Sequence, residues 1–171
     1  MTQLELQQRA LLAVVKGRPG EDPDLRRLAS SPEVALLRTI ALWWRAFHLE
    51  AQCPFTTRLL KRLGRFESAV GDYFDGNSTS PYAEELSAGF LTFLQSDQNE
   101  LLRRVSYFEK ALLSVRAGST ETFEVLWDAN PDLFFRALWE SRPLPTPEAE
   151  NLYRIRIGAE IPGLVACTLE L

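Results

Sequence analysis

Apolar residues recur at intervals of three and four along the first two thirds of the chain, as on one face of an α-helix. Helix starts are marked where a capping residue precedes proline, because proline at the first helical position sacrifices no hydrogen bond. Such pairs occur at Ser31-Pro32, Ser80-Pro81 and Asn130-Pro131. The predicted helices are about 4–16, a short one from Asp22 or Asp24, about 32–51, a short one from Thr56 or Thr57 to Leu63, one from Arg65 to Phe74, one from Pro81 to Leu94, one from Leu101 to Val115, and a short one after Asn130.

The pattern changes beyond Gly118, where apolar and polar residues alternate with a period near two. This period is typical of a strand, and it predicts strands at 120–127, 152–157 and 164–169. The expected fold class is α+β, mainly α: an N-terminal helical bundle followed by a small antiparallel sheet of about three strands. We place a helical domain at 1–118 and a β-sheet module at 119–171.

The predicted helix over 32–51 carries an unusually wide apolar stripe. It includes Leu36, Leu37, Ile40, Ala41, Trp43, Trp44, Phe47 and His48. A stripe of this width predicts a central, largely buried helix. Because adjacent side chains cannot both point inward, we expect Trp43 or Trp44 to be partly exposed and take both as candidate contacts for a partner.

Composition narrows the functional classes. The chain has 171 residues, of which 46% are hydrophobic, so it can bury one sizeable core. Its formal net charge of -4 repels nucleic acid and anionic membranes unless a local patch attracts them. The sequence offers neither a secretory signal nor an apolar stretch of membrane-spanning length, which predicts a cytoplasmic protein. The separated Cys53 and Cys167 predict free thiols rather than a disulfide.

One concentrated basic feature is present, formed by Arg58, Lys61, Arg62 and Arg65. On a helix these positions could share one face and bind phosphate or an acidic peptide. The favoured alternative is the solvated side of an amphipathic helix whose other side is leucine-rich. We take Arg58 and Arg62 as further candidate contacts for a partner.

Residues for independent catalysis are scarce. His48 is the only histidine, and the sequence contains no Cys-x-x-Cys, phosphate-binding loop, dinucleotide turn or Gly-x-Ser-x-Gly. We therefore assign no catalytic residue, metal ligand or cofactor to this chain. His48 acting as a base beside Cys53 is a minor alternative to a partly buried core histidine. Glu109 has two interpretations. The favoured one is an exposed or salt-bridged position, and the other is a buried carboxylate that anchors a partner or a backbone amide.

Several short motifs follow one another between Trp43 and Ala111. In order they are Cys53-Pro54, Leu59-Leu60, Gly64-x-Phe66, Tyr73-Phe74, Ser80-Pro81-Tyr82, Phe90-Leu91-x-Phe93-Leu94 and Phe108-Glu109-x-Ala111. Their order and spacing resemble the bacterial HvfC/BufC-type N-terminal domain, formerly described as a putative DNA-binding domain. The short chain with a terminal sheet is most similar to the stand-alone subunits of methanobactin and thiaglutamate biosynthesis.

The resemblance implies a non-catalytic subunit that forms a heterodimer with a multinuclear non-heme iron oxygenase. The iron would then lie on the partner, and the pair would modify cysteine in a ribosomally made precursor peptide. An exposed strand edge could bind the extended leader peptide as an added strand. We expect Phe123, Tyr153, Ile155 and Ile157 to line this region, the alternative being that they cover the core face of the sheet.

Two other functional classes stay open. A DNA-binding transcriptional regulator is the main alternative, because it would use the basic helix. An enzyme that acts alone comes third.

Overall fold

The structure is a computed structural model that describes residues 2–18, 20–77, 82–147 and 151–170. It confirms the predicted fold class, with helices preceding a three-stranded antiparallel sheet. The elements are α1 (Gln3–Val15), α2 (Pro23–Ala29), α3 (Pro32–Gln52), α4 (Pro54–Arg62), α5 (Phe66–Gly76), α6 (Ala83–Phe93), the 3-10 turn η1 (Leu94–Ser96), α7 (Glu100–Arg116), β1 (Phe123–Trp127), α8 (Pro131–Trp139), β2 (Leu152–Ile157) and β3 (Val165–Glu170).

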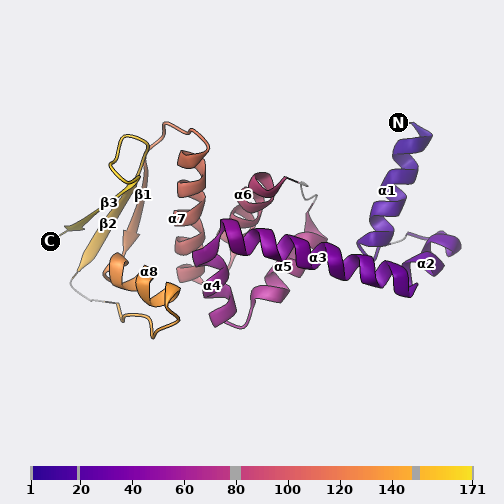
Figure 1. The fold of residues 1–171 in the computed structure, drawn as a ribbon, viewed down its shortest axis with the longest axis horizontal. Helices are drawn as coiled ribbons and strands as arrows, with labels where there is room; N and C mark the ends of the chain where they lie inside the picture. Colours follow the sequence, from indigo (N-terminus) through magenta and orange to yellow (C-terminus); the bar gives the residue numbers. More distant parts are fainter. Residues whose placement is uncertain (1, 19, 78–81, 148–150, 171) are drawn as a thin grey trace.

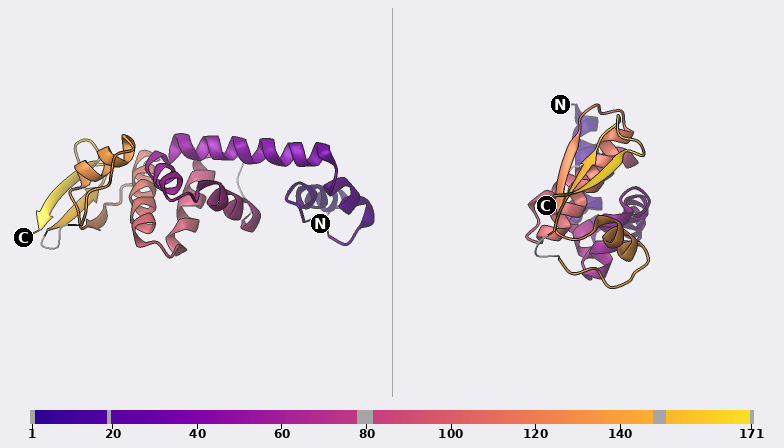
Figure 2. Two further views of the ribbon diagram at one scale, coloured as in Figure 1. Left: turned by 90° about the horizontal axis from the view of Figure 1, so that it is seen from below. Right: turned by 90° about the vertical axis from the view of Figure 1, so that its left-hand side faces the viewer.

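The molecule is elongated, with helices at one end and the sheet at the other (Figure 1). Helix α3 runs along the long axis, with α1 and α2 at its N-terminal end. Helices α4 to α7 gather beside its C-terminal half, and the sheet lies beyond α7 at the opposite end of the molecule. Figure 2 shows the same order from below, with α3 forming one long side.

Local sequence signals explain most helix boundaries. The side chains of Asp22, Ser31 and Asn130 each accept a backbone N–H in the first turn of a helix that begins with proline. The Ser80-Pro81 pair lies outside the described residues, and α6 begins after Tyr82. The prediction that Thr56 or Thr57 caps α4 is wrong, because both residues lie inside this helix and are buried.

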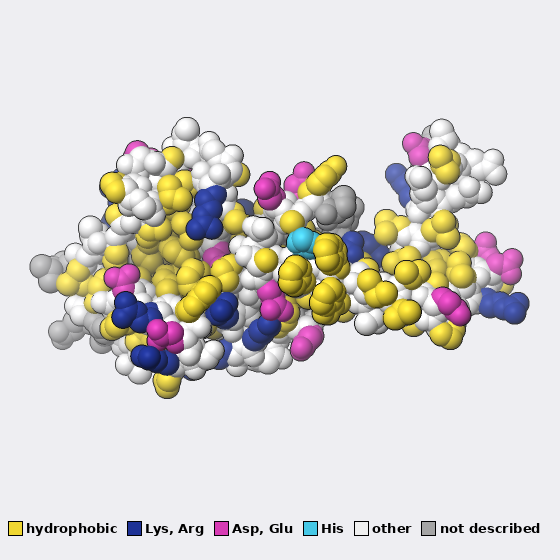
Figure 3. All heavy atoms as spheres, viewed as in Figure 1, with side chains coloured by type: hydrophobic (Ala, Val, Ile, Leu, Met, Phe, Trp, Pro, Cys, Tyr) yellow, Lys and Arg dark blue, Asp and Glu magenta, His cyan; other side chains and the backbone are white. Residues whose placement is uncertain are grey.

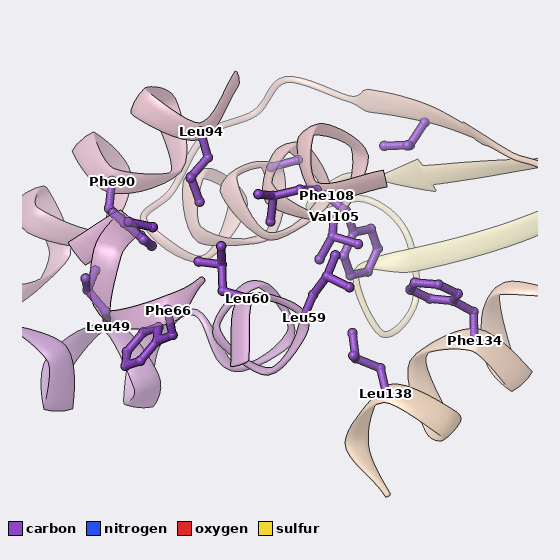
Figure 4. Close-up of a cluster of buried hydrophobic side chains, with 14 of the residues drawn as sticks. Leu49, Leu59, Leu60, Phe66, Phe90, Leu94, Val105, Phe108, Phe134 and Leu138 are labelled. Carbon is purple, nitrogen blue, oxygen red and sulfur yellow. The ribbon is translucent and has the colours of Figure 1, made fainter. Parts of the chain in front are cut away.

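The main core runs without interruption from the helices into the sheet. Figure 4 shows how α4 joins the two parts: Leu60 lies on the side of Leu49 and Phe90, whereas Leu59 lies on the side of Phe134 and Leu138 of α8. Trp127 of β1 contacts Phe134, with ring centroids 5.0 Å apart. The three strands and α8 all lie beyond the boundary near Gly118, and one apolar cluster continues across it.

The strands have the order β1-β2-β3, and both neighbouring pairs are antiparallel. In this register Val125 of β1 and Cys167 of β3 both lie opposite Ile155 of β2, so the three share one face of the sheet. The buried Val125 and Ile155 identify this face as the core side. On the other face, Arg154 forms ion pairs with Glu124 of β1 and Glu170 of β3.

A second, much smaller cluster joins the two N-terminal helices to the start of α3. Its buried members are Val14, Ala29 and Val34. The Arg38 side chain reinforces it by donating hydrogen bonds to the carbonyl oxygens of Val14 and Val15 at the end of α1. Most of α1 and α2 is exposed.

The prediction that α3 is central and largely buried is wrong. Of its 21 residues only Val34 and Leu49 are buried. The physical reason is geometric: the small N-terminal cluster covers one end of α3 and the helical body covers the other. Neither covers the outward side of the apolar stripe between them.

Candidate functional site

The uncovered part of α3 forms a continuous apolar surface, which we call the α3 face. Its members are Leu36, Leu37, Ile40, Trp43, Trp44 and Phe47, each between 52% and 64% exposed. At 100° per residue these positions fall within an arc of about 120°. They therefore form one face, and Figure 3 shows apolar side chains gathered along this helix.

The aromatic members of the α3 face form a packed group. The Phe47 ring stacks against Trp43 at a centroid distance of 5.9 Å and against Trp44 at 6.1 Å. The partly buried His48 ring meets Trp44 edge-on at 4.6 Å. These contacts hold the aromatic rings against one another and leave an extended apolar surface on the outside. The prediction that Trp43 or Trp44 is partly exposed is confirmed for both.

The size of the α3 face is unusual for an uncovered surface. With side-chain areas of about 150–250 Å² and the observed exposures, its six members leave on the order of 650 Å² open. The largest patch on a typical monomer is about 300–600 Å², and a stable interface buries about 800 Å² per partner. The α3 face therefore approaches the area that one side of a protein interface requires.

Acidic residues lie next to the C-terminal part of α3. Glu84 and Glu85 are exposed in the first turn of α6, where they line a shallow cleft together with Gln52 of α3. Acidic side chains are visible on both sides of the apolar patch in Figure 3. A surface complementary to this one would be apolar at its centre and basic at its rim.

The second candidate surface is the outer edge of β3, which we call the β3 edge. Strand β3 is the last strand of the sheet and lies on its outer side (Figure 1). Its core-side residues are less well covered than those of β1: Val125 and Trp127 are buried, whereas Cys167 is exposed and Leu169 is 46% exposed. The core side of the sheet is therefore partly uncovered at β3, and a further strand could be added at this edge.

The residues predicted to bind a peptide do not lie on the β3 edge. Tyr153, Ile155 and Ile157 belong to β2, the central strand, whose neighbours on both sides are already paired. Ile155 and Ile157 are almost completely buried, so the alternative that they cover the core face describes them correctly. Phe123 and Tyr153 are half-buried and pack against the same core. Sequence reasoning missed Cys167 and Leu169, although the alternating pattern of the last strand includes both.

The basic run does not form one helical face, and the favoured alternative describes α4 better: Leu59 and Leu60 are buried, whereas Lys61 and Arg62 are exposed. Helix α4 ends at Arg62, and Arg65 lies at the start of α5, where it pairs with Asp97 at 2.6 Å. Lys61 pairs with Glu50 at 2.6 Å. The two candidate contacts lie at the junction with α8: Arg58 stacks 3.9 Å from the Trp139 ring centroid, and Arg62 donates a hydrogen bond to the Arg142 carbonyl.

Glu109 is buried in the core, so the favoured expectation of an exposed or salt-bridged residue is wrong. Its two carboxylate oxygens accept the backbone N–H groups of Phe55 and Thr56, each at 2.7 Å. It thereby caps α4 from a distant helix, a role that Cys53 at the N-cap position does not fill with its own side chain. Burial raises the pKa of Glu109 to about 7, against the amide hydrogen bonds and the charge of Arg116, which lower it.

The environment of Cys53 is the opposite of an activated thiol. Burial is the main cause that raises the pKa of its thiol, and the nearby Glu109 carboxylate adds to the effect. A thiol with a raised pKa is a poor nucleophile because little thiolate forms near neutral pH. Both cysteines are free, as expected, and Cys53 is buried whereas Cys167 is exposed.

Among the described residues, no group of three or more His, Cys, Asp or Glu side chains is arranged to hold a metal ion. Across the same residues, none of the helices combines the length and apolar character needed to traverse a bilayer. The chain matches no protein-family model, no curated protein and no solved structure.

Proposed function

We propose that this chain is a binding subunit that holds a partner protein on the α3 face and an extended peptide on the β3 edge. The expected partner, from the resemblance of the motifs between Trp43 and Ala111, is a multinuclear non-heme iron oxygenase. The expected peptide is a ribosomal precursor whose cysteine the complex modifies. The iron would belong to the oxygenase, and this chain would contribute recognition.

The exposed α3 face is the observation that carries the proposal. Six large apolar side chains on one helix, with Trp43 and Trp44 at the centre, resemble the core of a protein interface, where aromatic residues are enriched. Keeping about 650 Å² of apolar surface in water costs free energy, which the contact with a partner would recover. Acidic residues beside the face favour a partner with a basic rim over a second copy of this chain.

The β3 edge supports the peptide part of the proposal. An extended peptide added to an edge strand gains main-chain hydrogen bonds, and its alternate side chains reach the core side of the sheet. Leu169 and Cys167 would face such side chains, because both lie on that side and are exposed.

DNA binding is supported less well. Lys61 and Arg65 are paired with acidic side chains, so two of the four cations of the basic run are already compensated. The chain also carries a net charge of -4. DNA binding that falls steeply with rising salt would revive this alternative, and no binding at low salt would remove it.

Co-purification with a tagged multinuclear non-heme iron oxygenase tests the partner. We expect a stable complex that Leu37→Ser on the α3 face weakens, with Leu126→Ser as the matched control. The two leucines are 54% and 48% exposed, and Leu126 lies on a strand far from α3. Trp43→Ala should weaken the complex most, by about 2 kcal/mol or more, as a central interface tryptophan does. A chain that elutes alone beside every such oxygenase would contradict the proposal.

Thiol alkylation tests the peptide. Cys167 is exposed and should react with N-ethylmaleimide, although partial burial raises the pKa of its thiol and slows the reaction. Cys53 is buried and serves as an unreactive internal control. A precursor peptide bound at the β3 edge should protect Cys167. Unchanged alkylation of Cys167 at saturating peptide would exclude this edge as the binding site.

A further inference from the structure

A basic cleft lies where α4 meets the turn after α8. It has a volume of about 580 Å³ and is lined by Arg58, Lys61, Arg62, Leu138, Ser141 and Pro143. Cations from α4 form one wall, and residues at and after the end of α8 form the other. This is a local concentration of positive charge in a chain whose net charge is negative.

Two of the cations are held in position by contacts that do not neutralise them. The Arg58 guanidinium carbon lies over the Trp139 ring, 3.9 Å from its centroid, in a cation–π contact that does not use the N–H donors of the guanidinium. Arg62 uses one of its five N–H groups to donate a hydrogen bond to the Arg142 carbonyl oxygen, at a nitrogen–oxygen distance of 2.6 Å. Lys61 is the exception, because Glu50 pairs with it. The cleft therefore presents two pre-positioned guanidinium groups, which suit carboxylates.

The surface around α8 extends from this cleft towards the β3 edge. A neighbouring depression shares Pro143 with the cleft and continues along α8 to Arg136 and Leu133, which are both exposed. The N-terminal half of α8 packs on the core side of the sheet, where Phe134 contacts Trp127, and Cys167 of β3 lies on that same side. In Figure 1, α8 lies between α4 and the sheet. A chain bound along β3 could therefore pass over α8 to the cleft.

We infer that this cleft binds acidic side chains, aspartate or glutamate, of a peptide segment that continues from the β3 edge over α8. The inference rests on the proposed function in taking the peptide to be the ligand of that edge, and it adds the chemical class of the segment. The apolar Leu138 and Pro143 beside the guanidinium groups favour a peptide with mixed acidic and aliphatic side chains over a nucleic acid.

Ser141 offers a test that leaves the cations in place. Its φ of 57° is the left-handed conformation that often ends a helix, and the Arg142 N–H donates to the Ala137 carbonyl as that motif requires. Asn and Asp adopt this conformation more readily than other non-glycine residues. Ser141→Asp and Ser141→Asn are therefore a matched pair that differ mainly by one negative charge inside the cleft.

The experiment measures the fluorescence anisotropy of a short labelled peptide in which glutamate alternates with leucine, added to the full chain alone. We expect binding that weakens with salt, is retained by Ser141→Asn, and falls at least about tenfold in Ser141→Asp and in the double variant Arg58→Gln/Arg62→Gln. Arg9→Gln on α1, also an exposed arginine, is the control and should bind normally. Circular dichroism checks that each variant is folded.

Three results would overturn the inference. The first is equal binding of the counterpart peptide that carries glutamine in place of glutamate. The second is equal affinity of the Ser141→Asp and Ser141→Asn variants. The third is a labelled oligothymidylate that binds more tightly than the acidic peptide and responds to the same variants, which would assign the cleft to nucleic acid. Because no oxygenase is present, failure here leaves the partner test on the α3 face unaffected, and the reverse is also true.

Discussion

Replacing Glu109 with glutamine tests the buried carboxylate that caps α4. In the native chain both carboxylate oxygens accept a backbone N–H, from Phe55 and from Thr56. Glutamine offers one carbonyl oxygen and one NH₂ group, so one of the two N–H groups then faces another donor. A buried donor without an acceptor costs about 1–3 kcal/mol. At acidic pH, where Glu109 is protonated, its hydroxyl oxygen can still accept one of these N–H groups, whereas the NH₂ group of glutamine cannot. We therefore expect the variant to be less stable than the native chain by about that amount at acidic pH.

The pH dependence of this difference has a definite sign. Burial raises the pKa of Glu109 from its ordinary 4.5 to about 7. Between these values the folded chain binds more protons than the unfolded chain, so this group's contribution to stability is complete below the unfolded pKa and falls as pH rises through the folded pKa. At about 1.36 kcal/mol per pH unit the loss is about 3 kcal/mol. Glutamine does not titrate, so the stability advantage of the native chain should shrink by this amount.

Urea unfolding followed by circular dichroism at about pH 5, 6, 7 and 8 measures both effects. Subtracting the variant from the native chain removes the contributions of other groups. One of these is Asp97, whose pKa the hydrogen bond from Arg65 lowers, so that its effect has the opposite sign. A native advantage that grows from pH 5 to pH 8 would refute the reasoning. It would mean that the two amide hydrogen bonds outweigh burial and hold the pKa of Glu109 below 4.5.

Three further predictions test backbone strain and packing. Ser141→Gly should raise the free energy of unfolding by about 1 kcal/mol in thermal denaturation, because glycine adopts a φ of 57° without strain; a lower melting temperature would contradict this. Gly89→Ala should destabilise by about 1–3 kcal/mol, because its new methyl group would overlap the buried Tyr73 hydroxyl. Adding Tyr73→Phe should restore part of the loss, and purely additive costs would argue against this overlap. Phe134→Ala should cost about 3–5 kcal/mol in urea unfolding, because it empties the space beside Trp127; a cost below about 1 kcal/mol would disprove that packing.

Most elements of the fold could be predicted because their signals are local. The caps at Asp22, Ser31 and Asn130 act within three residues, and the change of apolar period near Gly118 locates the start of the sheet region. The cap of α4 could not be predicted in this way. Glu109 lies 54 residues from Phe55 along the chain, and no local pattern connects them.

The candidate surfaces were predictable in kind but not in position. A wide apolar stripe on α3 indicates that the helix contacts apolar surroundings, yet it does not distinguish a core from a partner. Alternation along the last strands identifies which residues share a face, but strand order decides which of them lie at an edge. Ile155 and Ile157 therefore belong to the centre of the sheet, and Cys167 and Leu169 to its rim.

The small cluster formed by Val14, Ala29 and Val34 is separate from the main core, so the N-terminal helices can unfold locally while the rest of the chain stays folded. Three modest side chains stabilise α1 and α2 far less than the main cluster stabilises the rest, so these helices should open and close many times during the lifetime of the folded body. Amide hydrogens in α1 and α2 would then exchange with solvent deuterium early, and those of α7 late. A ligand that bound the first turns of α3 would therefore slow amide exchange in α1 and α2.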